Sequence, residues 1–259
     1  MKDIELFLFD MDGTLYLGNR LFPFTKRLLS EIKSAGKRYI FMTNNSSKSV
    51  ADYVGKLEKM GINTSEDDFL TSSQATALHL KTAYPGKRLY VCGTESLKTE
   101  LRKENFTVTE ELDEVEVVVM GFDTELTFKK LEDVCRLLLS RDLPYIATNP
   151  DYVCHTEFGS VPDCGSVCDM IFNATGKRPV VIGKPQAAMP RLAMERCNVS
   201  SKKTAVIGDR IYTDVISGIN AGAVSVLVLS GETTEEILSA SDVEPDLVLQ
   251  SAKELLQYI

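Results

Sequence analysis

Four short apolar runs in this chain each stop at residues with reactive or polar side chains, and this repeated pattern constrains the fold more than any other feature. The runs and the residues that end them are Ile4–Phe9 before Asp10, Arg38–Met42 before Thr43, Val180–Ile182 before Gly183 and Lys184, and Ala205–Ile207 before Gly208 and Asp209. Apolar runs of this length, separated by helical stretches, are typical of buried parallel strands in an α/β fold. Because sites in such sheets lie beyond the carboxyl ends of the strands, we expect the four motifs to converge on one crevice.

The first motif, Asp10-Met11-Asp12-Gly13-Thr14, places two carboxylates one residue apart. Asp and Gly are poor strand formers, so the motif marks a strand end that opens into a turn. Two close carboxylates need a counter-charge. Either one keeps a proton or a cation lies between them, and oxygen ligands suit a hard ion such as Mg2+. Taken alone, the motif is also compatible with a turn that carries two solvated acids.

The other motifs add the groups that phosphoryl transfer requires. Thr43 and Asn44 supply a hydroxyl and an amide, Lys184 supplies a positive charge, and Asp209 supplies another carboxylate. Catalysis of that reaction depends on positioning and on stabilising the charge of the transferred group. Simpler roles remain open, because Thr43 and Asn44 suit a turn and helix cap, and Lys184 suits a solvated helix start.

Over essentially its whole length, the chain resembles the haloacid dehalogenase-like (HAD) hydrolase superfamily, specifically its NagD-like branch of sugar and nucleotide phosphatases. The stretches Gly208-Asp209-Arg210-x-x-Thr213-Asp214 and Thr148-Asn149-Pro150-Asp151 resemble this branch rather than the superfamily at large. The resemblance implies a doubly wound parallel-sheet core of the α/β class, with a second α/β domain, the cap, inserted into it.

The resemblance also implies a role for each motif residue. Asp10 would be the nucleophile and Asp12 the general acid/base, and the phosphoryl group would be held by Thr43, Asn44 and Lys184. Mg2+ would be bound by Asp10, Asp209 and the backbone carbonyl of Asp12, and Asp214 would orient a water on the metal.

The activity that follows is Mg2+-dependent hydrolysis of a small-molecule phosphate monoester through an aspartyl phosphate. A sugar phosphate, a nucleoside monophosphate or an ester like p-nitrophenyl phosphate would fit. A phosphotransferase or phosphomutase would share the same site and differ only in the acceptor. A non-catalytic phosphometabolite-binding protein is an alternative from another class. A dehalogenase is disfavoured, because it needs neither Asp12 nor Asp209.

The long stretch between the second and third motifs predicts the inserted domain. It contains a second alternation of strands near 88–92, 115–120 and 144–147 with helices near 95–105 and 128–139. In the second helix, Phe128, Leu131, Val134, Cys135, Leu138 and Leu139 have helical spacing and predict one buried face. We expect a catalytic core of residues 1–81 and 179–259 and a cap of residues 82–178. Near the end of the chain, Thr233 and Glu236 have capping-box spacing for a short helix.

Substrate discrimination should come from the cap, because the core recognises only the phosphoryl group. The candidate specificity residues are Asn149, Asp151, Asp163, Cys164 and Gly165. The resemblance further implies that two copies of the chain could pair through the cap as a homodimer.

Composition excludes several partners. The net charge of -8 and a pI near 5.0 argue against a nucleic-acid partner, and no apolar run is long enough to cross a membrane. We therefore expect a cytoplasmic protein whose six cysteines are reduced. A zinc site built from Cys154, His155, Cys164 and Cys168 is disfavoured, because the spacing fits no common pattern.

Overall fold

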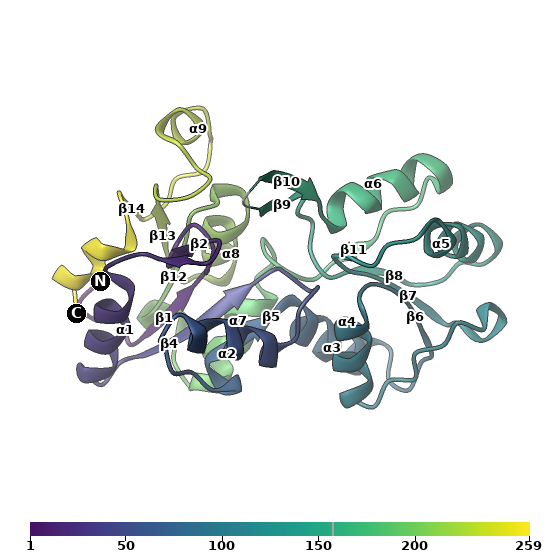
Figure 1. Ribbon diagram of the computed structural model, residues 1–259, viewed down its shortest axis with the longest axis horizontal. Helices are drawn as coiled ribbons and strands as arrows, with labels where there is room; N and C mark the ends of the chain where they lie inside the picture. Colours follow the sequence, from purple (N-terminus) through teal and green to yellow (C-terminus); the bar gives the residue numbers. More distant parts are fainter. Residues whose placement is uncertain (157) are drawn as a thin grey trace. The chain divides into compact units, whose positions relative to one another are not determined.

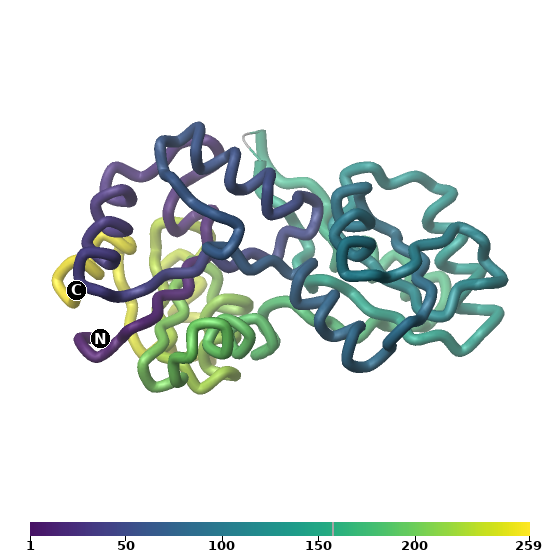
Figure 2. The backbone as a smooth tube through the Cα atoms, turned by 90° about the horizontal axis from the view of Figure 1, so that it is seen from below, coloured from purple at the N-terminus to yellow at the C-terminus, as the bar shows by residue number. Residues whose placement is uncertain are grey.

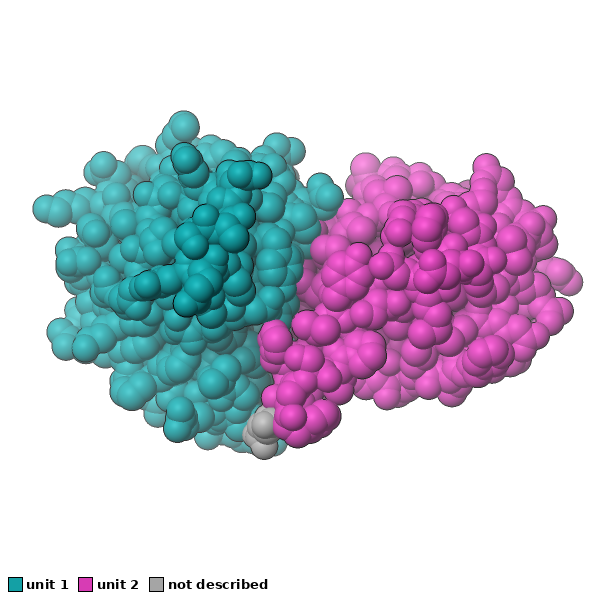
Figure 3. Space-filling model, turned by 90° about the horizontal axis from the view of Figure 1, so that it is seen from above, with its two compact units in different colours: residues 1–43, 53–70, 184–259 teal, residues 44–52, 71–183 magenta. Residues whose placement is uncertain are grey.

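The computed structural model describes residues 1–156 and 158–259, which form two compact units. Unit 1 contains residues 1–43, 53–70 and 184–259, and unit 2 contains residues 44–52 and 71–183 (Figure 3). Unit 2 therefore begins at Asn44, inside the second motif, and also holds the predicted insertion. The cap boundaries at residues 82 and 178 stay a prediction.

Unit 1 is built on a six-stranded sheet with the strand order β14-β13-β12-β1-β4-β5 (Figure 1). The strands are β1 (Leu6–Phe9), β4 (Arg38–Thr43), β5 (Phe69–Thr71), β12 (Thr204–Gly208), β13 (Val224–Val228) and β14 (Leu247–Leu249). The neighbours from β14 to β4 pair in parallel. From β1 the chain adds β4 and β5 on one side, and later β12, β13 and β14 on the other. This reversal makes the junction of β1 and β12 the switch point, where α/β sheets hold their sites.

Helices surround this sheet, so its central strands are buried on both faces. Every residue of β1 and β12 is buried, as expected for covered parallel strands. The helices are α1 (Thr25–Ser34), α2 (Val50–Lys59), α7 (Ala188–Cys197), α8 (Ile216–Ala221) and α9 (Glu235–Ser239), and a small hairpin is formed by β2 (Tyr16–Leu17) and β3 (Arg20–Leu21). Both chain termini lie in unit 1, close to each other (Figure 2).

Unit 2 contains a four-stranded parallel sheet with the order β11-β8-β7-β6 and a separate antiparallel hairpin. The sheet strands are β6 (Leu89–Cys92), β7 (Val117–Met120), β8 (Tyr145–Ala147) and β11 (Val180–Val181), and the hairpin is β9 (Val153–Thr156) with β10 (Gly159–Pro162). The helices are α3 (Ser72–Ala83), α4 (Glu95–Lys103), α5 (Phe128–Ser140) and α6 (Cys164–Thr175). Helices α5 and α6 pack on one face of the sheet, and α3 and α4 lie on the other (Figure 1).

The α/β class and parallel sheets predicted from the sequence are confirmed. Every helix that lies within 1–156 or 158–259 is too short or too polar to cross a bilayer.

Two local predictions were wrong. On α5, Val134, Leu137 and Leu138 are buried, but Phe128 is 80% exposed and Leu139 is 64% exposed. At roughly 100° per residue, both exposed side chains point away from the buried stripe.

The second error concerns the cap of helix α9. The N-cap of α9 is Thr234, whose side chain accepts a hydrogen bond from the Ile237 backbone N–H. The Thr233 hydroxyl instead accepts one from the Ile211 N–H at 3.1 Å, so a tertiary contact uses the residue assigned to the capping box.

An aromatic cluster on strands β4 and β5 should contribute strongly to the free energy of unfolding of unit 1. Phe41 is fully buried, and its ring centroid lies 5.1 Å from those of Tyr39 and Phe69. We expect Phe41→Ala to lower the free energy of unfolding by about 3–5 kcal/mol, because it leaves a cavity. Leu17→Ala is the control, since Leu17 is 52% exposed. Urea unfolding followed by circular dichroism measures both, and equal losses in the two variants would contradict this packing.

Candidate active site

The catalytic candidates of unit 1 leave neighbouring strands at the switch point. Strands β1 and β12 pair with Phe9 opposite Ile207, and the Asp10 N–H donates to the Ile207 carbonyl at 2.8 Å. Asp10 and Asp209 therefore follow adjacent strand ends. The sequence prediction that these two motifs converge agrees with this geometry.

Three carboxylates meet at this edge of the sheet. Oxygen atoms of Asp10, Asp209 and Asp214 all lie within 4.8 Å of one another. Asp209 and Asp214 are buried, and the Asp10 side chain is 15% exposed. Asp214, which we expect to orient a water on the metal, contributes its carboxylate to this cluster, and that role stays a prediction.

Lys184 supplies a positive charge inside the cluster. Its Nζ donates to Asp10 Oδ1 and Asp214 Oδ1, each at 2.6 Å, and to the Met42 carbonyl at 3.2 Å. The side chain is only 3% exposed, and helix α7 begins four residues later at Ala188. Lys184 is therefore a buried ion-pair partner and not a solvated lysine at a helix start.

The cluster carries an excess of negative charge. With Asp10, Asp209 and Asp214 ionised and Lys184 protonated, three negative charges face one positive charge, which leaves two in excess. Burial raises the pKa of Asp10 to about 7 against the opposing charge of Lys184, and it raises the pKa of Asp209 well above its ordinary value. Burial alone would lower the pKa of Lys184, but Asp10 and Asp214 outweigh it and raise that pKa. A divalent cation would balance the charge.

The carboxylate of Asp209 has one satisfied and one unsatisfied oxygen. Oδ2 accepts a hydrogen bond from the Glu232 backbone N–H at 2.7 Å. Oδ1 is buried and has no hydrogen-bond partner among the residues that the structure describes. A buried carboxylate oxygen without a donor is costly, and a metal ion would satisfy it. The donor set of carboxylate oxygens and the orphaned Oδ1 thus fit a hard divalent ion.

Glycines make room for these carboxylates. A Cβ on Gly13 would lie 2.4 Å from Asp209 Oδ2, and one on Gly231 would lie 2.0 Å from the same atom. Gly13 also has φ +80, a left-handed conformation that favours glycine. Gly208 makes room for Asp214 in the same way, because a Cβ on Gly208 would lie 2.2 Å from Asp214 Cγ.

The remaining predicted residues of unit 1 lie at strand ends. Asp12 is exposed, and its Oδ1 accepts from the Gly18 N–H at 3.4 Å. Its carboxylate is not part of the three-carboxylate cluster, in keeping with the prediction that Asp12 would contribute only its backbone carbonyl to a metal. Thr43 is the buried last residue of β4.

The candidate residues of unit 2 form a buried hydrogen-bond network. Asn44 Nδ2 donates to Asp151 Oδ2 at 2.9 Å, and Asn149 Nδ2 donates to Asp151 Oδ2 and to Asp163 Oδ1, each at 3.0 Å. Asp163 Oδ1 also accepts from the Cys164 N–H and caps helix α6.

Close backbone packing completes this region of unit 2. A Cβ on Gly165 would lie 2.2 Å from the Pro150 carbonyl oxygen. The network and this packing give all of these residues a structural role, and their contribution to substrate specificity stays a prediction.

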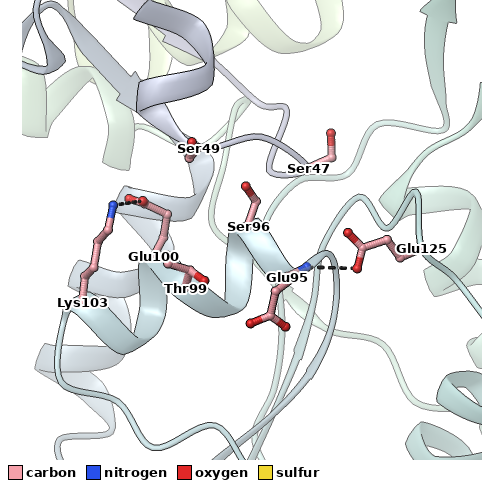
Figure 4. Close-up of a pocket in the computed structure, with 8 residues that line it drawn as sticks. All are labelled: Ser47, Ser49, Glu95, Ser96, Thr99, Glu100, Lys103 and Glu125. Atoms are coloured by element: carbon pink, nitrogen blue, oxygen red, sulfur yellow. Dashed lines mark hydrogen bonds and ion pairs between the residues drawn. The ribbon is translucent and has the colours of Figure 1, made fainter. Parts of the chain in front are cut away.

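A separate pocket of about 450 Å3 also lies in unit 2, and its polar lining is shown in Figure 4. It is lined by Ser47, Ser49, Glu95, Ser96, Thr99, Glu100, Lys103 and Glu125. Some of its polar groups bond one another: the Glu95 backbone N–H donates to Glu125 Oε2 at 3.1 Å, and Lys103 pairs with Glu100 at 2.8 Å. The pocket shares no residue with the carboxylate cluster of unit 1.

All six cysteines are free thiols.

Sequence reasoning missed the loop that follows β13. Ser230 Oγ donates to the Gly13 carbonyl at 2.7 Å, the Glu232 N–H holds Asp209, and the Thr233 N–H donates to the Asp209 carbonyl at 3.1 Å. The available signal was a fifth apolar run, Val224–Leu229, that ends at Ser230-Gly231.

The chain matches two family models. The model of haloacid dehalogenase-like hydrolases covers residues 7–107, and that of HAD-hydrolase-like proteins covers residues 181–255. The chain is 32% identical to the 5'-nucleotidase YutF of Bacillus subtilis over 259 residues, which is 100% of both proteins. It is 30% identical to an acid sugar phosphatase of Staphylococcus saprophyticus over 257 residues, covering 99% of this chain and 98% of that one.

Solved structures give the same result. The 4-nitrophenylphosphatase of Thermotoga maritima is 40% identical with a TM-score of 0.94, covering 99% of this chain and 97% of that one. NagD of Escherichia coli K-12 is 29% identical with a TM-score of 0.88, covering 97% of this chain and 98% of that one.

The contact between Gly231 and Asp209 can be tested directly. In Gly231→Ala the new methyl group would displace the Asp209 carboxylate, and we expect Mg2+ affinity to fall about 10-fold or more. Gly55→Ala in helix α2 is the control, because a Cβ at Gly55 meets nothing within 4 Å. Thermal shift as a function of Mg2+ concentration measures the effect. Equal Mg2+ responses in Gly231→Ala and the wild type would show that this contact does not position Asp209.

Proposed function

Because this chain belongs to the haloacid dehalogenase-like hydrolases, in the branch that contains NagD, and is a phosphatase of that family, we propose that it hydrolyses small-molecule phosphate monoesters with Mg2+ through an aspartyl phosphate on Asp10. The observation that carries the proposal is the buried cluster of Asp10, Asp209, Asp214 and Lys184 in unit 1.

Mg2+ would be held by Asp10, Asp209 and the backbone carbonyl of Asp12, with Asp214 beside them. The orphaned Asp209 Oδ1 and the two excess negative charges support this assignment. When bound, the ion supplies a positive charge that neutralises the repulsion between the Asp10 carboxylate and an anionic phosphoryl group.

Asp10 acts as the nucleophile. One carboxylate oxygen forms a bond to phosphorus as the bond from phosphorus to the ester oxygen breaks, which leaves an acyl phosphate on Asp10. The hydrogen bond from Lys184 to Oδ1 fixes the orientation of the carboxylate. Asp10 is also the most exposed of the three clustered carboxylates, with a side chain that is 15% exposed, and this gives a substrate access to it.

Asp12 moves the protons in both steps. It first gives a proton to the leaving alcohol oxygen and becomes a carboxylate. It then takes a proton from the water that attacks phosphorus, which releases inorganic phosphate and restores the Asp10 carboxylate. Its exposed position, outside the three-carboxylate cluster, supports a role in exchange with leaving group and water.

Thr43, Asn44 and Lys184 hold the phosphoryl oxygens during transfer. The Lys184 ammonium is positioned for charge stabilisation because it already bridges Asp10 and Asp214. Thr43 ends β4, the strand next to β1 in the sheet, and Asp10 follows β1.

The names of the relatives support a substrate class. They are named as a 5'-nucleotidase, an acid sugar phosphatase and a 4-nitrophenylphosphatase, so we propose nucleoside monophosphates and sugar phosphates as substrates and p-nitrophenyl phosphate as a test substrate. Residues 82–178 would select among them. A homodimer through this cap and a cytoplasmic location remain predictions.

Removal of the metal tests its proposed role. We expect hydrolysis of p-nitrophenyl phosphate to be lost after exhaustive chelation and restored by added Mg2+, because the excess charge otherwise repels the substrate. A spectrophotometric assay before and after dialysis against a chelator measures this. Full activity in chelator would contradict the metal assignment. Tight phosphate binding without turnover at saturating Mg2+ would favour the non-catalytic alternative.

Two variants distinguish the roles of the two carboxylates of the first motif. Asp10→Asn should abolish turnover of every ester, because an amide cannot form the acyl phosphate. Asp12→Asn should slow alkyl phosphates about 10²- to 10⁴-fold in the first step and affect p-nitrophenyl phosphate least, because a good leaving group needs little protonation. Single-turnover release of the alcohol distinguishes the variants. A correctly folded Asp10→Asn protein with wild-type rates would refute the nucleophile assignment.

A further inference from the structure

The loop that holds Asp209 also carries an ion pair that the proposed reaction does not use. Arg210 Nε lies 2.8 Å from Glu232 Oε2, and the two side chains are 21% and 22% exposed. The Tyr212 hydroxyl donates to Glu232 Oε1. Both ionic residues are adjacent to the carboxylate cluster, because Arg210 follows Asp209 in the chain and the Glu232 N–H binds Asp209 Oδ2.

We propose that Glu232 is a positioning residue that pairs with Arg210 and so keeps the guanidinium charge from opposing a divalent cation at Asp209. This inference rests on the proposed function, since it concerns the metal of the same site. The Arg210–Glu232 pair would thereby set the balance between the binding of a cation and the binding of phosphate.

The backbone ties these side chains to the site. The Arg210 N–H donates to Asp214 Oδ2 at 3.1 Å, and the Thr233 N–H donates to the Asp209 carbonyl. The backbone N–H groups of Arg210 and Glu232 are thus bonded to the carboxylates of Asp214 and Asp209, two of the three in the cluster. Movement of either partner would change where its charge lies relative to them.

The charge of Arg210 reaches the carboxylates. It is among the groups that lower the pKa of Asp10 and of Asp209 against the effect of burial. A positive charge near the carboxylates weakens the binding of a divalent cation there and strengthens the binding of an anion. A neighbouring carboxylate reduces both effects. Glu232, at 2.8 Å, is placed to provide that reduction.

The two charges predict effects of opposite sign. Glu232→Gln should weaken Mg2+ binding about two- to fivefold, the size expected for a partly exposed charge, whereas Arg210→Gln should strengthen it by a similar factor. The double variant should return close to the wild type. Inorganic phosphate at saturating Mg2+ should show the reverse order, with tighter binding to Glu232→Gln and weaker binding to Arg210→Gln.

Isothermal titration calorimetry of the metal-free full chain with Mg2+, and then of the Mg2+-saturated chain with inorganic phosphate, measures both affinities without turnover. Arg210→Lys should stay close to the wild type because it keeps the charge. Glu5→Gln is the matched control. Glu5 also loses an ion pair, with Lys203 at 2.6 Å, but it lies before strand β1 whereas Asp10 follows it.

A purely structural role for the pair would move Mg2+ affinity in the same direction in both single variants, and that result would overturn the inference. Wild-type affinities in both variants would also overturn it. Asp209→Asn, run in parallel, separates this failure from that of the proposed function. If the wild type binds no Mg2+, or Asp209→Asn binds it as tightly as the wild type, then the metal site and the inference both fail. If Asp209→Asn alone loses binding, only the role of the ion pair is refuted.

Discussion

The hydrogen bonds from the buried ammonium of Lys184 to Asp10 and Asp214 are the contacts on which the rest of the site depends. An unpaired ammonium would be expensive to bury, and so would carboxylates without a counter-charge. Each group is therefore held by the others, and the orientation of the Asp10 carboxylate, the proposed nucleophile, is fixed by its hydrogen bond from Lys184. The single positive charge of Lys184 does not balance three ionised carboxylates, which supports the proposal of a divalent cation at this site.

The sheet topology brings these residues together from distant parts of the chain. The strand order reverses between β1 and β12, so Asp10 and Asp209 end neighbouring strands although about 200 residues separate them. Close approach then requires glycine at Gly13, Gly208 and Gly231, because a Cβ at any of them would collide with a clustered carboxylate. The loop after β13 completes the arrangement by bonding one oxygen of Asp209 and leaving the other without a donor.

The ends of β1, β4 and β12 were predictable because each apolar run stops at a polar motif, a signal that is local in the sequence. The run Val180–Ile182 also contains a strand, β11, but in the four-stranded sheet of unit 2 and with Val180 57% exposed. The buried face of α5 was only partly predictable. Phe128 and Leu139 are apolar, but helix geometry points them away from the sheet, and apolar identity alone does not reveal that. Thr233 had the spacing of a helix cap and instead bonds the Ile211 N–H, a tertiary contact with no sequence signal. The resemblance implied a site role for Asp214, but its ion pair with Lys184 depends on the π-helical turn Ile211–Val215, which leaves no pattern in the residues.

The central claim is that Asp10 becomes covalently phosphorylated, and chemical trapping tests it most directly. The wild-type chain, mixed with Mg2+ and a phosphate ester and then treated with borohydride, would have any acyl phosphate reduced to an alcohol that mass spectrometry of peptides can locate. We expect reduction of the Asp10 side chain to that of homoserine, dependent on substrate. Turnover without any reduced aspartate, or reduction at a different carboxylate, would contradict it.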